Sequence, residues 1–136
     1  MDMIELDLVN RYGELARVHR LIDELGLKNH WDQAVIFQLK LALSEAINNV
    51  INHGYGGEGD KPITLRVIVK AEQIEIQIFD QGKSFLIHER EAKTPPPCSE
   101  SGRGIFLIFH CMDKAHSARR GNWNELTLVK ELRKSC

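Results

Sequence analysis

At 136 residues the chain has the commonest length of a single domain, so we expect one domain over residues 1–136. Its 43% hydrophobic and 27% charged residues are typical of a globular protein that is long enough to bury a core. The formal net charge of −1 gives no reason to expect nucleic acid or an acidic membrane surface as a partner.

Cysteine usage and the start of the chain bear on its compartment. The three cysteines, Cys98, Cys111 and Cys136, are widely spaced and form no CxxC pair. This favours a reducing compartment and argues against a disulfide framework or a zinc site. Acidic residues interrupt the first apolar run, so we expect no signal peptide, and no stretch approaches the length needed to span a bilayer. The sequence therefore predicts a cytoplasmic protein without membrane contact.

Hydrophobic periodicity predicts the first three elements. Alternation over residues 4–9 predicts a strand, and apolar residues at helical spacing over 13–25 predict a helix that ends at Gly26. We expect Asp32 to cap a second helix that runs to residues 53–54, where a glycine-rich segment breaks it.

The second half predicts two hairpins separated by a helix. The strands are expected at residues 63–70, 74–79, 115–120 and 124–132, with a helix at 102–112. Three consecutive prolines at 95–97 indicate an irregular connection before that helix. We interpret the adjacent Arg119 and Arg120 as a solvated strand end rather than a binding patch.

The resulting order is β-α-α-β-β-α-β-β, which groups hairpins instead of alternating single strands with helices. It predicts an α+β fold: a two-layer α/β sandwich whose mixed, mostly antiparallel sheet is covered on one face by three helices.

The second helix carries an unusual polar stripe. Glu45, Asn49 and His53 follow one another at intervals of four, which places them on one side of a helix. Glu45 could accept a proton from, or orient, an attacking hydroxyl or water. Asn49 could ligate Mg²⁺, which completes its octahedron with phosphate oxygens and water. On this stretch alone, a partly exposed helix end is an equally good interpretation.

Two glycine-containing segments point to the same kind of ligand. A carboxylate at Asp80 can accept a hydrogen bond from the exocyclic amine of adenine, and Gly82 leaves room for a flat ring. An ordinary Asp-x-Gly turn is the alternative. Gly102 and Gly104 open a helix whose free amides favour an anion, and Arg103 could contact the outer phosphates.

In this order the segments Glu45-x-x-x-Asn49-x-x-x-His53-Gly-Tyr, Asp80-x-Gly82-x-x-Phe85 and Gly102-Arg-Gly104 resemble the N box and the two glycine boxes of the GHKL ATPases. That superfamily includes gyrase, Hsp90, histidine kinases and MutL. Within it the chain is most similar to the small bacterial anti-sigma factor serine kinases, and the resemblance spans nearly the whole chain, including SEAINNVINHGY and GRGIFLI.

The resemblance implies a Bergerat-type fold with ATP between the long helix and a lid at residues 86–101. It implies that Glu45 is the general base, that Asn49 holds Mg²⁺ and that Asp80 binds the adenine amine. The nucleotide-binding residues that we expect are Asn49, His53, Asp80, Gly82, Phe85, Gly102, Arg103 and Gly104.

By the same resemblance, the expected function is that of a bacterial serine/threonine protein kinase. Its partners would be a small anti-anti-sigma protein of the STAS type, which it phosphorylates, and a sigma factor, which it sequesters. Homodimers are common in that branch. Arg17, on the exposed side of the first helix, is our hypothesis for a docking residue, and a merely solvated side chain is the alternative.

Two other functions fit the same nucleotide site. A histidine kinase catalytic domain would need a phospho-accepting helical segment, and the sequence offers no upstream region for it. A nucleotide-gated binding module without phosphotransfer would hold a partner only, and the presence of Glu45 argues against it.

Overall fold

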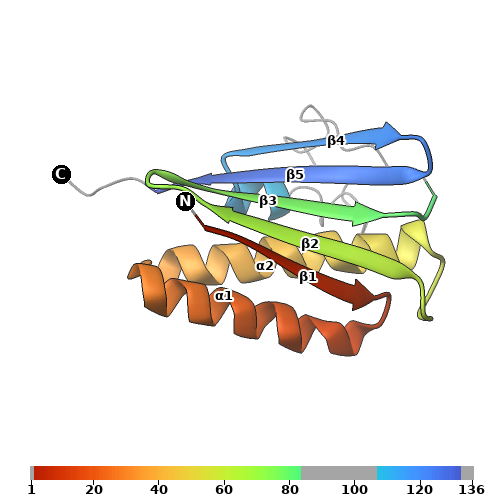
Figure 1. Ribbon diagram of the computed structural model, residues 1–136, viewed down its shortest axis with the longest axis horizontal. Coiled ribbons are helices and arrows are strands. Elements are labelled where there is room, and N and C mark those ends of the chain that lie inside the picture. The colour runs from red at the N-terminus through yellow and green to blue at the C-terminus, as the bar shows by residue number, and fades with distance from the viewer. Residues whose placement is uncertain (1, 84–106, 133–136) are drawn as a thin grey trace.

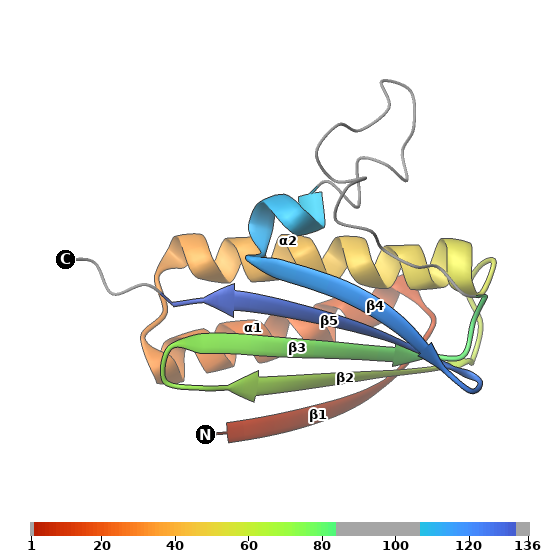
Figure 2. The ribbon, with the colours of Figure 1, turned by 90° about the horizontal axis from the view of Figure 1, so that it is seen from above.

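A five-stranded sheet forms one layer of the protein (Figure 1). The computed structural model describes residues 2–83 and 107–132. The strand order is β1-β2-β3-β5-β4, and every neighbouring pair is antiparallel. The strands are β1 (Asp2–Val9), β2 (Pro62–Val69), β3 (Gln73–Asp80), β4 (Lys114–Arg120) and β5 (Trp123–Glu131). Because α1 (Leu15–Asn29), α2 (Gln33–Asn49) and a helical segment at residues 107–111 all lie on one face, the predicted α+β sandwich is confirmed (Figure 2).

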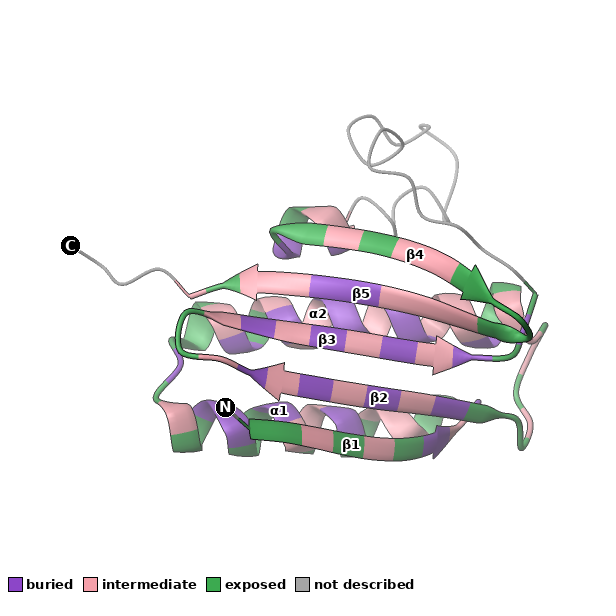
Figure 3. Cartoon of the chain, turned by 45° about the horizontal axis from the view of Figure 1, so that its top comes forward, coloured by how far each residue is buried: buried purple, intermediate pink, exposed green. Residues whose placement is uncertain are grey.

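The two central strands alternate strictly between buried and half-buried residues, as Figure 3 shows. In β2 and β3 the buried positions are isoleucine, leucine or valine until Asp80, which ends β3. Because successive side chains of a strand point to opposite faces, one face of the sheet packs against the helices while the other faces solvent. The inward position of Asp80 therefore places a carboxylate at the edge of the core.

Helix α1 continues past the glycine at which we expected it to end. Gly26 lies inside the helix, and the left-handed residue His30 (φ 57°) ends it instead. A Cβ atom on Gly26 would lie 2.6 Å from Cδ1 of Ile36. The glycine thus allows α1 and α2 to approach each other closely, and the predicted helix end was wrong because this contact is not local.

Helix α2 is the central element of the helical layer. Its buried side chains follow a helical spacing: Ile36, Leu39, Ala42, Leu43, Ala46 and Ile47. Asp32 occupies the N-cap position as predicted, but its side chain makes no capping hydrogen bond. By length and composition alone the 22-residue span Gln33–Gly54 could cross a membrane, contrary to our expectation. In the structure its apolar side chains belong to the core that α2 shares with the sheet.

A π-helical turn, η2 (Val50–Gly54), extends α2. The amide of Tyr55 donates to the carbonyl of Val50 at 2.8 Å, which spans five residues instead of four. Wide turns of this kind occur frequently at functional sites. Because this wider turn directly follows Asn49, the residue four positions later, His53, no longer lies on the same side of the helix as Asn49.

The helical segment 107–111 packs beside α2 and next to the last two strands (Figure 2). Ile108 and Cys111 are buried in the core, and Lys130 Nζ donates to the carbonyl of Cys111 at 2.7 Å. The predicted third helix therefore exists at its C-terminal end, whereas residues 102–106 lie outside the described residues.

Candidate nucleotide-binding site

A buried carboxylate and an amide face each other where β3 and β5 pair. Asp80 is the last residue of β3, and Asn124 is its register partner on β5. Asp80 is only 6% exposed. The Nδ2 of Asn124 donates to Oδ1 of Asp80 at 2.9 Å, so an acceptor at the end of one strand is bound by a donor on the next.

The turn after Asp80 gives its carboxylate a second donor. The amide of Gly82 donates to the same Oδ1 at 2.8 Å. Both hydrogen bonds recorded for this carboxylate thus converge on one oxygen. Within the part of the chain that the structure describes, Oδ2 of Asp80 takes part in no hydrogen bond and remains available to a ligand.

Arg119 and Asn124 are functional candidates that our sequence analysis missed. Arg119 of β4 lies opposite Asn124, and its Nη1 donates to Oδ1 of Asn124 at 2.8 Å and to the carbonyl of Gly82 at 3.1 Å. Arg119 is exposed at the end of β4, in keeping with the interpretation of a solvated strand end, and it makes these two hydrogen bonds in addition. Arg120, its neighbour, is exposed and forms a surface ion pair with Glu125 at 3.1 Å. The register of the two pairings is what brings Arg119 and Asn124 to Asp80, and no local motif signals it.

Gly82 lies against the end of η2. A Cβ atom at this position would lie 2.6 Å from the carbonyl carbon and oxygen of Gly54. The amide of Lys83 also donates to the carbonyl of Gly54 at 2.7 Å. The Asp-x-Gly segment is thus held directly against the polar end of the α2 helix, which explains why a glycine stands there.

Two hydrogen bonds of the Tyr55 hydroxyl hold the turn after β3 against β2. Its hydroxyl donates to the carbonyl of Pro62 at 2.6 Å and accepts a hydrogen bond from the amide of Gln81 at 2.7 Å. Burial raises the pKa of Tyr55, although the hydrogen bond from Gln81 opposes this. The phenol therefore stays protonated near neutral pH and acts as a fixed spacer between β2 and the turn after β3.

A pocket opens between the end of α2, the turn after β3 and the β4–β5 hairpin. Its lining combines apolar side chains with a few polar groups: Ala46, Asn49, Val50, Gly54, Asp80, Lys83, Ser117, Asn124, Glu125 and Leu126. Apolar walls with a small number of placed polar groups are typical of sites for small molecules. Three predicted ligand-binding positions, Asn49, Asp80 and Gly82 through its turn, thus meet at one place.

Asn49 brings an unsatisfied polar group to this pocket. Its Nδ2 is buried and has no hydrogen-bond partner in the described part of the chain. An unpaired buried amide costs free energy, about 1–3 kcal/mol. A ligand that bonds to the amide would recover that cost. The Oδ1 of Asn48, one residue earlier, is also buried and unpaired, and we have no physical account of it.

The electrostatics of Asp80 reflect its burial. Loss of solvent raises the pKa of Asp80 above its ordinary value, and the hydrogen bonds from Asn124 and Gly82 and the charge of Arg119 lower it again. These donors favour the ionised carboxylate, which is the form that accepts a hydrogen bond from an amine at both oxygens.

The structure places the other predicted residues apart from this lining. Glu45 lies half-buried on α2 one turn before Asn49. His53 is exposed and does not line the pocket, because η2 brings Gly54 into the place that an α-helix would give to His53. Arg17 lies on α1, where it pairs with Glu14 at 3.2 Å and donates to the carbonyl of Asp7.

Several predicted positions lie outside the described residues: Phe85, Gly102, Arg103, Gly104 and the lid at residues 86–101.

The fold agrees with comparisons to known proteins. The family described as "Histidine kinase-like ATPase domain" matches residues 8–130, so the chain belongs to that family. Relatives include the serine-protein kinase RsbW of Listeria monocytogenes, 34% identical over 118 residues that cover 81% of this chain and 74% of the relative. The serine/threonine-protein kinase BtrW of Bordetella bronchiseptica is 26% identical over 114 residues, or 79% of each chain.

Solved structures show the same fold at lower identity. The RsbU and RsbW domains of Rv1364c from Mycobacterium tuberculosis match with a TM-score of 0.72 and 16% identity, over 97% of this chain and 32% of that one. This chain thus spans about a third of that larger protein. The catalytic domain of the histidine kinase ThkA matches over 97% of both chains, with a TM-score of 0.54 and 15% identity. The predicted resemblance to GHKL proteins and to anti-sigma serine kinases is confirmed.

Proposed function

We propose that this protein is an ATP-dependent serine/threonine protein kinase that phosphorylates a small anti-anti-sigma partner and sequesters a sigma factor in the bacterial cytoplasm. The RsbW and BtrW relatives are named as serine or serine/threonine kinases, which supports the kinase class. We also propose that residues 1–136 form one domain.

One observation carries the nucleotide part of the proposal. Within the described residues, both hydrogen-bond donors to the buried carboxylate of Asp80 bind one oxygen, Oδ1, and Asp80 lines a largely apolar pocket in which Oδ2 remains for a ligand. Adenine presents an amine donor on a flat ring, whereas guanine presents a carbonyl oxygen at the same place. An ionised carboxylate accepts the first and repels the second, so the pocket favours ATP over GTP.

Asn49 and Glu45 would serve the phosphate end of the nucleotide. Within the described residues Nδ2 of Asn49 has no hydrogen-bond partner, and Asn49 lines the pocket, so its oxygen would bind Mg²⁺ and its nitrogen would donate to a phosphate. The described residues contain no group of three His, Cys, Asp or Glu that could hold a metal without the phosphates. Mg²⁺ would supply charge neutralisation, and Glu45, one turn earlier, would orient the acceptor hydroxyl and take its proton.

The runner-up is a nucleotide-gated binding module that holds a partner without phosphotransfer. It would use the same adenine pocket but would not need the carboxylate of Glu45. The histidine kinase alternative draws support from the fold of ThkA, yet the sequence relatives point to the serine kinase branch.

Calorimetry with ATP tests the proposed site. The wild-type protein should bind ATP more tightly with Mg²⁺ than without it, and Asn49→Ala should remove most of that difference, because one metal ligand is lost. Asn52→Ala is the matched control, since Asn52 is an exposed asparagine one turn away whose side chain accepts a bond from Tyr12. Equal gains from Mg²⁺ in the wild type and in Asn49→Ala would contradict the metal assignment.

A further inference from the structure

A row of three side chains crosses the sheet beside the pocket. Asp80, Asn124 and Arg119 are successive cross-strand neighbours on β3, β5 and β4. Hydrogen bonds of 2.9 Å and 2.8 Å join them in that order. Apart from Asp80, none of these residues belongs to the three nucleotide-binding segments that the sequence indicates, so the row extends the site along the sheet.

The chemistry of the row fixes the orientation of the central amide. An arginine only donates hydrogen bonds, and an ionised carboxylate only accepts them. Asn124 therefore must turn its oxygen to Arg119 and its nitrogen to Asp80. The carbonyl of Gly82 reinforces this choice, because it accepts from Nδ2 of Asn124 at 2.9 Å and from Nη1 of Arg119 at 3.1 Å. No other rotation of the amide would satisfy all three neighbours.

This fixed amide determines which oxygen of Asp80 a ligand meets. Oδ1 of Asp80 is occupied by Asn124 Nδ2 on one side and by the amide of Gly82 on the other. The two donors approach from different elements, so the carboxylate can neither rotate nor exchange its oxygens without breaking a bond. Oδ2 is the oxygen that remains for the pocket, into which Asp80 and Asn124 both project.

We propose that Asn124 is a positioning residue for purine recognition: it holds the Asp80 carboxylate so that Oδ2 accepts the exocyclic amine of adenine, and Arg119 in turn holds Asn124. Asn124 acts through Asp80 and need not touch the reacting phosphates. The inference rests on the proposed function, because it concerns the nucleotide that the same pocket would bind.

The test compares two nucleotides that differ in one group. ATP carries the exocyclic amine, and purine riboside triphosphate lacks it. The ratio of their dissociation constants, measured by calorimetry with Mg²⁺ present, reports the contact between Asp80 and the amine. A loss of folding or of general affinity would weaken both nucleotides equally and would leave the ratio unchanged.

The expected result is a wild-type protein that prefers ATP and an Asn124→Ala variant in which that preference falls about tenfold, as expected when a charge-assisted hydrogen bond loses its geometry. The affinity for purine riboside triphosphate should stay nearly constant. Arg119→Ala should lower the same ratio by a smaller factor, because it acts one bond further away. Asn122→Ala, an exposed asparagine in the same hairpin, is the matched control and should leave the ratio unchanged.

Asn124→Asp gives a second variant of nearly identical shape in case the alanine variant fails to fold. The new carboxylate would lie beside that of Asp80 and repel it, so this variant should lower the preference for ATP at least as far as Asn124→Ala does. An unchanged ratio in a folded Asn124→Ala or Asn124→Asp protein would overturn the positioning role while leaving the proposed function intact. A wild-type protein that binds neither nucleotide would instead overturn the proposed function, and the inference with it.

Discussion

Gly82 lies so close to the backbone of Gly54 that the turn after β3 has no room for a side chain at this position. A Cβ atom on Gly82 would lie 2.6 Å from the carbonyl carbon and oxygen of Gly54, which are backbone atoms and cannot rotate away. This contact joins the end of the helical segment η2 to the turn that follows Asp80, two segments that are separate in the sequence.

Gly82→Ala should therefore destabilise the protein by about 1–3 kcal/mol, because one of the two backbones must shift. ATP affinity should fall as well, since the shift moves the amide that binds Asp80. Thermal unfolding and ATP titration measure the two effects. Gly13→Ala is the control, because a Cβ there would have no atom within 4 Å. Unfolding temperatures that match in the two variants would contradict this account.

Replacement of Asp80 by asparagine should change how stability depends on pH. Burial raises the pKa of Asp80 in the folded protein above its ordinary value of 3.8. Between these two values the folded protein binds more protons than the unfolded chain, so stability falls as pH rises through this window and is constant above it. Asp80→Asn cannot ionise, so it should lack this decline.

Urea unfolding of the wild type and of Asp80→Asn at several pH values checks this expectation, since the difference between the two proteins isolates the one carboxylate. The variant should gain stability relative to the wild type from acid to neutral pH. It should also lose ATP binding, because the new amide would point a donor at the adenine amine. A stability difference that stays the same at every pH would show that burial does not govern the ionisation of Asp80.

Local patterns sufficed for much of the fold. The alternation in β2 and β3 and the helical spacing in α1 and α2 arise from burial on one face, which a sequence displays directly. Gly26 was misjudged because its role depends on Ile36 of the next helix. In the same way, the place of His53 could not be predicted, because no local pattern indicates the π-helical turn at residues 50–54.

The candidate site also contains some residues that local motifs predict and others that depend on non-local contacts. Asp80 and Asn49 lie in recognisable motifs and meet in one pocket, as expected. Asn124 and Arg119 lie outside the nucleotide-binding segments, because their position beside Asp80 follows from the register of β3, β5 and β4. Only the set of cross-strand partners reveals them.

Asn10 should contribute strongly to stability by holding the loop after η2. It is 2% exposed, and its side chain donates to the carbonyl of Gly57 at 2.8 Å and accepts from the amide of Lys61 at 2.7 Å. Asn10→Ala would leave both backbone groups unpaired and should cost about 2 kcal/mol or more. Chemical denaturation measures the loss, and the exposed Asn122→Ala provides the comparison. Equal stability of the two variants would contradict the role of Asn10.

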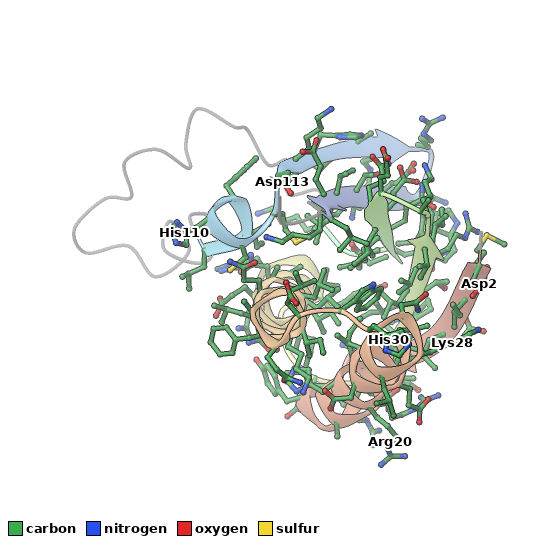
Figure 4. All side chains as sticks on the ribbon, turned by 90° about the vertical axis from the view of Figure 1, so that its left-hand side faces the viewer. Asp2, Arg20, Lys28, His30, His110 and Asp113 are labelled. Atoms are coloured by element: carbon green, nitrogen blue, oxygen red, sulfur yellow. The ribbon has the colours of Figure 1, made fainter. Side chains whose placement is uncertain are left out.

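The substitution Arg17→Glu tests the hypothesis that a partner docks on α1. The side chain is exposed on α1 and lines a shallow groove with Leu6, Arg20, Leu21 and Glu24, and Arg20 projects from α1 away from the sheet (Figure 4). Arg17→Glu should weaken binding of an acidic partner surface without changing ATP affinity, because the groove and the nucleotide pocket share no lining residue. Pull-down and ATP titration measure the two properties. An unchanged complex would remove Arg17 from the docking surface.

Phosphotransfer to a serine of a small anti-anti-sigma protein is the measurement that tests the central claim most directly. The protein, labelled ATP, Mg²⁺ and candidate partners from neighbouring genes would be incubated together, and phosphoserine would be followed over time. We predict that the wild type transfers the label and that Glu45→Ala binds ATP with unchanged affinity but transfers none. A wild type that binds both ATP and the partner without forming phosphoserine would contradict the kinase assignment and favour the binding module.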